Sequence, residues 1–116
     1  ATPCVPLVLA LQRQLQRVAA EGLEQRWARH LDLRTRTLQW AAARGFTPFV
    51  AAEASRSPTV SCIHARGGDV AALAQRAKAA GFLIDQGYGS LRGVAFRIGH
   101  MGDHGPARLD ALLRAL

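Results

Sequence analysis

The sequence predicts an α+β fold: a two-layer sandwich in which a small, mostly antiparallel sheet carries helices on one face, preceded by a long helix. Three observations favour this fold class. Apolar residues recur every three or four positions over about the first 45 residues, and two later segments repeat this helical spacing. Short β-branched or alternating segments lie between these helical segments. The expected order of elements is α-β-β-α-β-β-α.

The first segment, residues 1–45, predicts one long helix. Thr2 is placed to cap it, Pro3 suits the first helical position, and Gly45 is a candidate for its C-terminal end. An unbroken helix of about 40 residues would be about 60 Å long, which exceeds the width of a domain of this size. We therefore expect the helix to bend, with Gly22 the favoured place, or to extend beyond its domain. An overhanging apolar stripe would indicate a partner, either another domain or another subunit.

The remaining residues contain shorter elements that glycine and proline separate. Four segments have the composition or alternation of strands: residues 46–52, 59–65, 82–85 and the first half of 94–102. Two segments have the spacing of helices: residues 69–80 and the residues that follow Gly105. Pro48 places the first strand at an edge of the sheet, Asp69 can cap the first of these helices, and Gly81 ends it.

The stretch 94–102 reads Val-Ala-Phe-Arg-Ile-Gly-His-Met-Gly, and its first half alternates like a strand. Val94, Phe96 and Ile98 fall on one face, where apolar side chains favour packing, whereas Arg97 falls on the other face between two small residues. An arginine on the open face of a strand presents a guanidinium that can bind a carboxylate or phosphate through two parallel hydrogen bonds. A solvated arginine on an edge strand is the alternative.

Composition limits the classes of function. The chain has 116 residues, of which 49% are hydrophobic and 20% charged, and no apolar run is long enough to cross a bilayer, so we expect no membrane partner. The net charge of +7 comes from dispersed arginines, and those at residues 26–36 are expected to face water, so we expect no nucleic-acid partner. Cys4 and Cys62 show no metal-binding or redox spacing, which favours reduced thiols in a cytoplasmic protein.

Few residues offer catalytic chemistry. His100, Asp103 and His104 are zinc-ligand types, but they lie in a glycine-broken loop, and no metal site is expected. Residues 87–89, Gly-Tyr-Gly, form either an anion-binding nest or a plain connection. Lys78, the only lysine, lies on an alanine-rich helix surface and is a poor catalytic amine. No catalytic residue is assigned, and an anion-binding arginine without catalytic machinery indicates part of a site.

Several motifs resemble those of one enzyme family. Phe96-Arg97-Ile98-Gly99-His100-Met101-Gly102 resembles the C-terminal signature of class V pyridoxal-phosphate aminotransferases of the alanine–glyoxylate or serine–glyoxylate type. Further segments resemble that family in the same order along nearly the whole chain: Thr2-Pro3-Cys4-Val5, Glu21-Gly22-Leu23-Glu24 with Arg26-Trp27 and His30, Arg56-Ser57-Pro58-Thr59-Val60, and Asp85-Gln86-Gly87-Tyr88-Gly89.

The resemblance implies the small C-terminal domain of a homodimeric enzyme with the aspartate-aminotransferase fold. Residues 1–45 would be the interdomain helix, residues 46–116 the small domain, and the large cofactor-binding domain would be absent from this chain. Arg97 matches the family's arginine that binds the substrate α-carboxylate. Thr2 matches the threonine that helps hold the phosphate of pyridoxal phosphate in the neighbouring subunit. The Schiff-base lysine and the residues that stack on and pair with the cofactor ring belong to the large domain, so this chain alone should be inactive.

The expected function is the substrate-carboxylate-binding domain of an aminotransferase that moves an amino group from alanine or serine to a 2-oxo acid such as glyoxylate. The amino donor stays open, because alanine, serine, aspartate, ureidoglycine and aminoethylphosphonate users share this pattern. Two alternatives come from other classes of function. One is a stand-alone binding or dimerisation module that keeps the fold without catalysis. The other is a nucleic-acid-binding domain, which the +7 charge favours and which predicts steeply salt-dependent retention on DNA or RNA.

Overall fold

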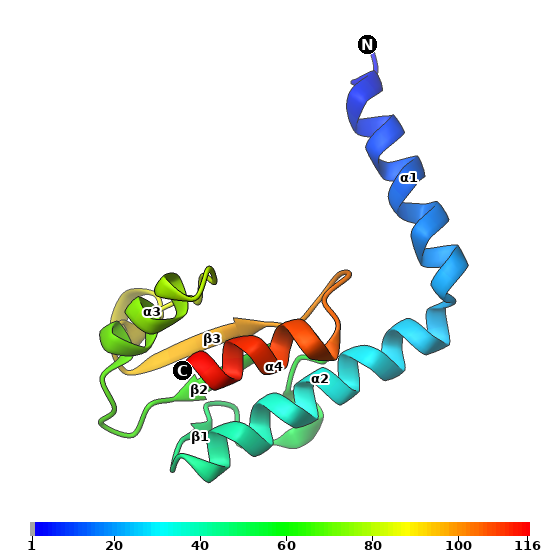
Figure 1. The fold of residues 1–116 in the computed structure, drawn as a ribbon. Coiled ribbons are helices and arrows are strands. Elements are labelled where there is room, and N and C mark those ends of the chain that lie inside the picture. Colours follow the sequence, from blue (N-terminus) through cyan, green and yellow to red (C-terminus); the bar gives the residue numbers. More distant parts are fainter. Residues whose placement is uncertain (1) are drawn as a thin grey trace.

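The computed structural model describes residues 2–116, and the structural statements below concern this part of the chain. The helices and strands follow in the order α1 (Val5–Glu21), α2 (Leu23–Ala43), β1 (Thr47–Pro48), β2 (Val60–His64), α3 (Val70–Ala79), β3 (Ala95–Gly99) and α4 (Pro106–Ala115). Short 3-10 turns lie at Glu53–Ser55 and Gly89–Leu91. Figure 1 shows a compact unit built from α2 to α4 and the strands, with α1 projecting away from it.

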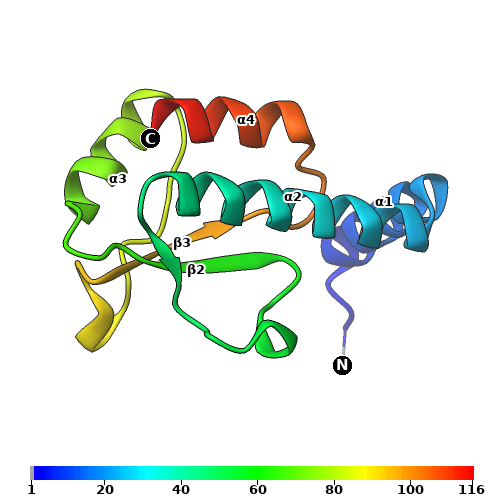
Figure 2. The ribbon, with the colours of Figure 1, turned by 90° about the horizontal axis from the view of Figure 1, so that it is seen from below.

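The three strands form one antiparallel sheet in the order β1-β2-β3. Helices α2, α3 and α4 lie on one side of this sheet, as the view in Figure 2 shows. Side chains from all three helices join the inward-facing residues of β2 and β3 in a single apolar cluster. The predicted α+β fold, with helices on one face of a small antiparallel sheet, is therefore confirmed.

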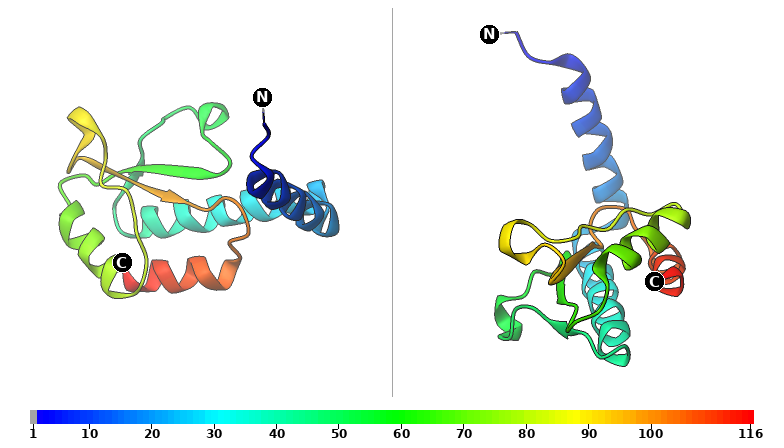
Figure 3. Two further views of the ribbon diagram at one scale, coloured as in Figure 1. Left: turned by 90° about the horizontal axis from the view of Figure 1, so that it is seen from above. Right: turned by 90° about the vertical axis from the view of Figure 1, so that its left-hand side faces the viewer.

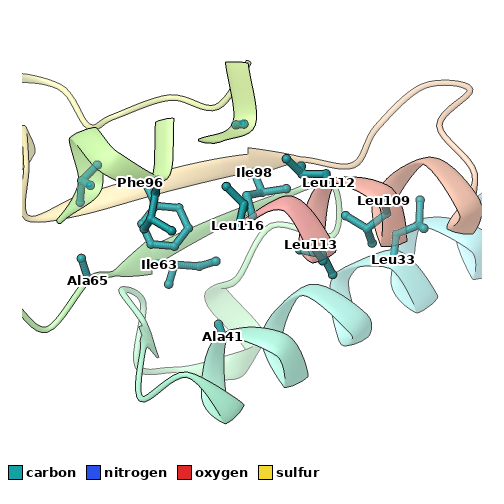
Figure 4. Close-up of a cluster of buried hydrophobic side chains, with 13 residues drawn as sticks. Leu33, Ala41, Ile63, Ala65, Phe96, Ile98, Leu109, Leu112, Leu113 and Leu116 are labelled. Carbon is teal, nitrogen blue, oxygen red and sulfur yellow. The ribbon is translucent and has the colours of Figure 1, made fainter. Parts of the chain in front are cut away.

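The core sits between the sheet and the helices, and Figure 4 shows its side chains converging from both layers. Phe96 is completely buried, and its ring meets the rings of Trp40 and Phe46 edge-on at centroid distances of 6.3 and 5.6 Å. Trp40 Nε1–H donates a 2.9 Å hydrogen bond to the carbonyl oxygen of Leu113, which joins α2 to α4. Ile98 is also buried, whereas Val94 is 41% exposed and does not share the packed face.

The long N-terminal helix bends at Gly22, as the sequence predicts. Gly22 has a φ of +87°, a conformation that costs glycine little because it has no Cβ, and this angle ends α1 and starts α2. The expected start at Thr2 and Pro3 is wrong by a few residues, because α1 begins at Val5 with Cys4 at its N-cap. Gly45 follows the last turn of α2 with a φ of +76°, which confirms the predicted C-terminal end.

Helix α1 has no buried residue, and large apolar side chains along it are more than half exposed, including Leu7, Leu11 and Leu15. Because α1 projects (Figure 3), the radius of gyration is 16.2 Å, compared with about 13 Å for a compact chain of this length. The apolar stripe thus overhangs the packed unit. No helix within residues 2–116 is both long enough and apolar enough to cross a membrane.

The strand expected at residues 82–85 does not form. The Phe82 N–H instead donates to the carbonyl oxygen of Ala77 and closes the C-terminal cap of α3. Phe82 is therefore part of the helix cap and not of a strand. Only Asp85 reaches the sheet, as a single bridge to Arg97. The strand expected at residues 46–52 shortens to the two residues of β1.

Candidate functional site

The candidate site lies on the face of the sheet that the helices leave uncovered. Along β3, Phe96 and Ile98 point into the core, and Arg97 between them points to the opposite face with a half-exposed side chain. The antiparallel register places Cys62 of β2 opposite Arg97. The strand alternation therefore puts Arg97 where the sequence predicts it, on a firmly packed strand but facing outward.

The half-exposed side chain of Arg97 is bound by Asp85 through two parallel hydrogen bonds. Arg97 Nε–H donates to Asp85 Oδ1 at 2.9 Å, and Nη2–H donates to Oδ2 at 2.8 Å. The pair lowers the pKa of the Asp85 carboxyl, with a further contribution from the Gly87 N–H, and it raises the pKa of Arg97. Both side chains are therefore charged at neutral pH, and the two charges compensate each other.

Asp85 is itself held by the turn that follows it. The Gly87 N–H donates to Asp85 Oδ1 at 2.8 Å, which is an Asx-type turn. Gly87 has a φ of +87°, and a Cβ at this position would lie 2.3 Å from the carbonyl oxygen of Leu91. Of the two possibilities for residues 87–89, the plain connection fits, because the N–H of Gly87 binds a carboxylate of this chain in an Asx turn.

The thiol of Cys62 lies on the same face as Arg97, at the strand position opposite to it. Burial raises the pKa of Cys62, the positive charge of Arg97 opposes this shift, and the negative charge of Asp85 reinforces it. Cys62 is therefore a protonated thiol at neutral pH and a poor nucleophile. Both Cys62 and Cys4 are free thiols, and Cys4 is exposed at the N-cap of α1.

Two of the three metal-ligand types after β3, His100 and Asp103, have different partners. His100 is 1% exposed, and its Nε2 lies 3.0 Å from Ser61 Oγ inside the domain. Asp103 pairs instead with Arg17 and Arg26, both at 3.0 Å. Within residues 2–116, no three His, Cys, Asp or Glu side chains gather in a way that could hold a metal ion.

Burial of His100 has a consequence for stability. It lowers the pKa of this histidine to about 4, so the unfolded chain takes up a proton at higher pH than the folded one. We expect the stability of the domain to fall by about 2 to 3 kcal/mol as the pH drops from 6.5 to 4, and to become independent of this group above about pH 7.5.

Chemical denaturation at several pH values measures this dependence, with His100→Gln as the control that cannot titrate. The slope between pH 6.5 and 5 should disappear in the variant, since the pKa values of Glu21, Asp85 and Asp103 are all shifted downward, away from this interval. A wild-type protein with constant stability across that interval would show that His100 has an ordinary pKa.

A network of ion pairs at the helix bend joins α1, α2 and the loop after β3. Arg26 Nη1 lies 2.7 Å from Glu21 Oε2 and 3.0 Å from Asp103 Oδ1, and Arg29 Nε donates to Glu21 Oε1 at 2.6 Å. Arg29 also donates to the carbonyl oxygen of Gly102 at 2.9 Å. The hydrogen bond from Arg29 is the largest cause that lowers the pKa of Glu21 to about 2.

This network corrects the expectation that the arginines of residues 26–36 face water. Arg26 is only 9% exposed, because its two carboxylate partners lie on other segments of the fold. Asp103 is 77 residues away from Arg26 in the sequence, so spacing within the helix gave no signal of the pair. The ion pairs hold the bend in one geometry.

Thr2 and Lys78 lie away from Arg97. Thr2 is exposed and precedes α1, whose N-terminal end lies far from β3 (Figure 1). Lys78 is exposed on α3, in the helical layer that covers the inner face of the sheet. The structure therefore brings Arg97 together with Asp85 and Cys62, and it leaves both Thr2 and the only lysine outside this cluster.

No family model matches this chain. Curated relatives are nevertheless similar over most of it. The chain is 32% identical over 116 residues to a protein of Synechococcus sp. named soluble hydrogenase, small subunit. It is 35% identical over 104 residues to serine–glyoxylate aminotransferase of Methylorubrum extorquens, and 34% identical over 113 residues to 2-aminoethylphosphonate–pyruvate transaminase of Aeromonas hydrophila. The chain spans between 26% and 30% of the length of these relatives.

Solved structures show the same correspondence. The fold superimposes with a TM-score of 0.88 on pyridoxamine–pyruvate aminotransferase of Mesorhizobium loti, which is 33% identical, and covers 30% of that chain. It superimposes with a TM-score of 0.87 on alanine–glyoxylate aminotransferase of Nostoc sp., which is 28% identical, and covers 31% of that chain. Nearly all of the present chain is included in both superpositions.

Proposed function

Because this chain is homologous to the C-terminal part of class V aminotransferases, we propose that it is the substrate-carboxylate-binding domain of such an enzyme. The full enzyme would use pyridoxal phosphate to move an amino group from a small amino acid, such as alanine or serine, to a 2-oxo acid such as glyoxylate. One observation carries this proposal: an arginine on the uncovered face of the sheet, already oriented by a carboxylate, in a fold shared with these enzymes.

The names of the similar proteins support a carboxylate as the ligand of Arg97. Their amino donors differ widely, from serine and alanine to 2-aminoethylphosphonate and pyridoxamine. Their acceptors are either glyoxylate or pyruvate, which share a carboxylate next to a carbonyl group. A guanidinium binds this planar anion through two parallel hydrogen bonds. Arg97 would thus recognise the part of the substrate that stays constant across the family.

In this proposal residues 1–45 connect two domains, and residues 46–116 form the small one. The exposed apolar side chains of α1 support a covering partner, because water-facing leucines along a helix are stabilised by burial. The large domain of the same enzyme and a second subunit are the partners proposed. Helix α2 also contributes Leu33 and Ala41 to the core, so it would move together with the small domain.

Pyridoxal phosphate would be held mainly by residues outside this chain. When bound, it supplies the electron sink for the bond-breaking step of transamination. Lys78 is exposed on α3, which agrees with a cofactor-binding lysine elsewhere in the enzyme. Thr2 offers an exposed hydroxyl that suits a phosphate oxygen. The N-terminal end of α1, which Thr2 precedes, projects away from β3 (Figure 1), and this supports a role for Thr2 at the site of the neighbouring subunit in a homodimer.

Free thiols at Cys4 and Cys62 favour a reducing compartment, and we place the enzyme in the cytoplasm. The hydrogenase name of one relative belongs to a protein of which this chain covers 30%, and the proposal does not carry it over.

Substrate analogues test the proposal directly. Pyruvate and pyruvamide differ in one group, a carboxylate against an uncharged carboxamide. We expect the full-length enzyme with its cofactor to use pyruvate with a kcat/KM about 100-fold higher than that for pyruvamide, because the amide forms no charge-assisted pair with Arg97. Equal use of both would exclude carboxylate recognition. A full-length protein that binds 2-oxo acids without transamination would favour the binding-module alternative.

A further inference from the structure

The guanidinium of Arg97 has two edges that can bind a carboxylate, and Asp85 occupies one of them. Its oxygens accept from Nε and Nη2, which is the side-on edge. A guanidinium carries five N–H donors, so the end-on edge formed by Nη1 and the second hydrogen of Nη2 remains. Within residues 2–116, no group accepts a hydrogen bond from Nη1 of Arg97. One arginine therefore presents one occupied and one open edge.

Asp85 is fixed on both its backbone and its side chain. Its N–H donates to the carbonyl oxygen of Arg97 at 3.2 Å, and its carbonyl oxygen accepts from the Arg97 N–H at 2.9 Å. Gly87 holds the carboxylate from the other side at 2.8 Å, in a turn that tolerates no side chain at this position. The carboxylate is therefore tethered to the same strand as the guanidinium that it orients.

We propose that Asp85 is a positioning residue for the substrate carboxylate: it holds Arg97 side-on so that the end-on edge faces the 2-oxo acid. This inference rests on the proposed function of Arg97. In this arrangement the substrate does not displace Asp85, and the two carboxylates bind different edges of one guanidinium. An arginine side chain with several rotatable bonds is thereby fixed before the substrate arrives, which lowers the entropic cost of binding.

The charges of Arg97 and Asp85 favour recognition of the substrate by oriented hydrogen bonds over recognition by net electrostatic attraction. Arg97 and Asp85 together carry no net charge, so recognition depends on directed hydrogen bonds rather than on a long-range field. Both side chains are roughly half exposed, at 48% and 42%, and water screens the repulsion between Asp85 and a second carboxylate. Orientation of the guanidinium is therefore the dominant contribution of Asp85.

The test measures the KM for pyruvate of the full-length enzyme and of its Asp85→Ala and Asp85→Asn variants. We expect Asp85→Ala to raise KM about tenfold with little change in kcat, because the charge of Arg97 remains but its orientation is lost. Asp85→Asn keeps one acceptor oxygen and should raise KM about threefold. Repeating each measurement near 1 M salt, where the Debye length is about 3 Å, removes most of the charge contribution.

A double-mutant cycle separates positioning from a general structural role. In an Arg97→Ala background, Asp85→Ala should no longer raise KM, because no guanidinium remains to be oriented and loss of the unpaired carboxylate removes its repulsion of the substrate. Asp32→Ala is the matched control: Asp32 forms an ion pair of similar length and exposure with Arg36 on α2, and its loss should not change KM. The dissociation constant of propionate, a carboxylate that cannot react, should follow the same order among the variants.

The outcomes are distinct. An unchanged or lower KM in Asp85→Ala at high salt would overturn the proposal, and a lower value would identify Asp85 as a competitor of the substrate. An equal increase in KM with and without Arg97 would also overturn it, because the role would be structural. If Arg97→Ala itself leaves KM unchanged, the proposed function fails, and this result is separate from the Asp85 variants.

Discussion

Replacing Arg97 with alanine in the full-length enzyme is expected to raise the KM for glyoxylate or pyruvate at least about 100-fold. Each hydrogen bond to a charged group contributes about 1.5 to 3 kcal/mol, and the substrate carboxylate loses two of them. The Asp85 carboxylate then remains without its partner on the uncovered face, which adds repulsion towards an anionic substrate. Steady-state kinetics with the 2-oxo acid varied at a saturating amino donor measures this effect.

Arg97→Lys is the control for this prediction. It keeps the positive charge but not the planar pair of donors, so an intermediate KM, about tenfold above wild type, is expected. The preference for pyruvate over pyruvamide should also disappear in Arg97→Ala, because the discriminating group is removed. A wild-type KM in Arg97→Ala would mean that another residue of the enzyme binds the carboxylate, and Arg97 would then be only the partner of Asp85.

Replacing Phe96 with alanine is expected to destabilise the domain by about 3 to 5 kcal/mol, which corresponds to a decrease in Tm on the order of 10 to 20 °C. Phe96 is completely buried and meets Trp40 and Phe46 edge-on, so its removal leaves a cavity between the sheet and α2. Thermal and chemical unfolding measure the loss.

Phe49→Ala removes the same side chain from a position that is 41% exposed, and it should cost less than about 1 kcal/mol. Because both variants replace phenylalanine with alanine, the difference in their free energies of unfolding measures the effect of burial. A similar, small loss in both would indicate that the packing of β3 against the helices does not stabilise the domain. In that case β3 would not be a rigid support for Arg97.

Local patterns were sufficient to predict much of the fold. The alternation around Arg97 placed Phe96 and Ile98 in the core, because side chains on a strand alternate between its two faces. Gly22 and Gly45 marked the bend and the end of the long helical segment, since both adopt a positive φ. The strand expected at residues 82–85 failed for a physical reason: the cap of α3 uses the Phe82 N–H, and only Asp85 reaches the sheet.

The site was predictable in part. The direction of Arg97 followed from the strand period, but its pairing with Asp85 did not, because the two segments meet at a single bridge. The signal that was available is the Asp85-Gln86-Gly87 sequence, in which an aspartate two residues before glycine is typical of an Asx turn. The burial of Arg26 left no local signal, since its partner Asp103 lies on a loop at the other end of the sequence.

The ion pairs around the bend at Gly22 determine the direction in which α1 projects. Its 17 residues extend about 25 Å from the bend, so a rotation of about 10° at Gly22 would displace its far end by about 4 Å. Arg26 and Arg29 connect this bend to the loop that directly follows β3. The position of the N-terminal end of α1 therefore depends on the few ion pairs that fix the bend at Gly22. A force applied to the far end of α1 would therefore be transmitted through Arg26 and Arg29 to the loop after β3, and so to the strand that carries Arg97.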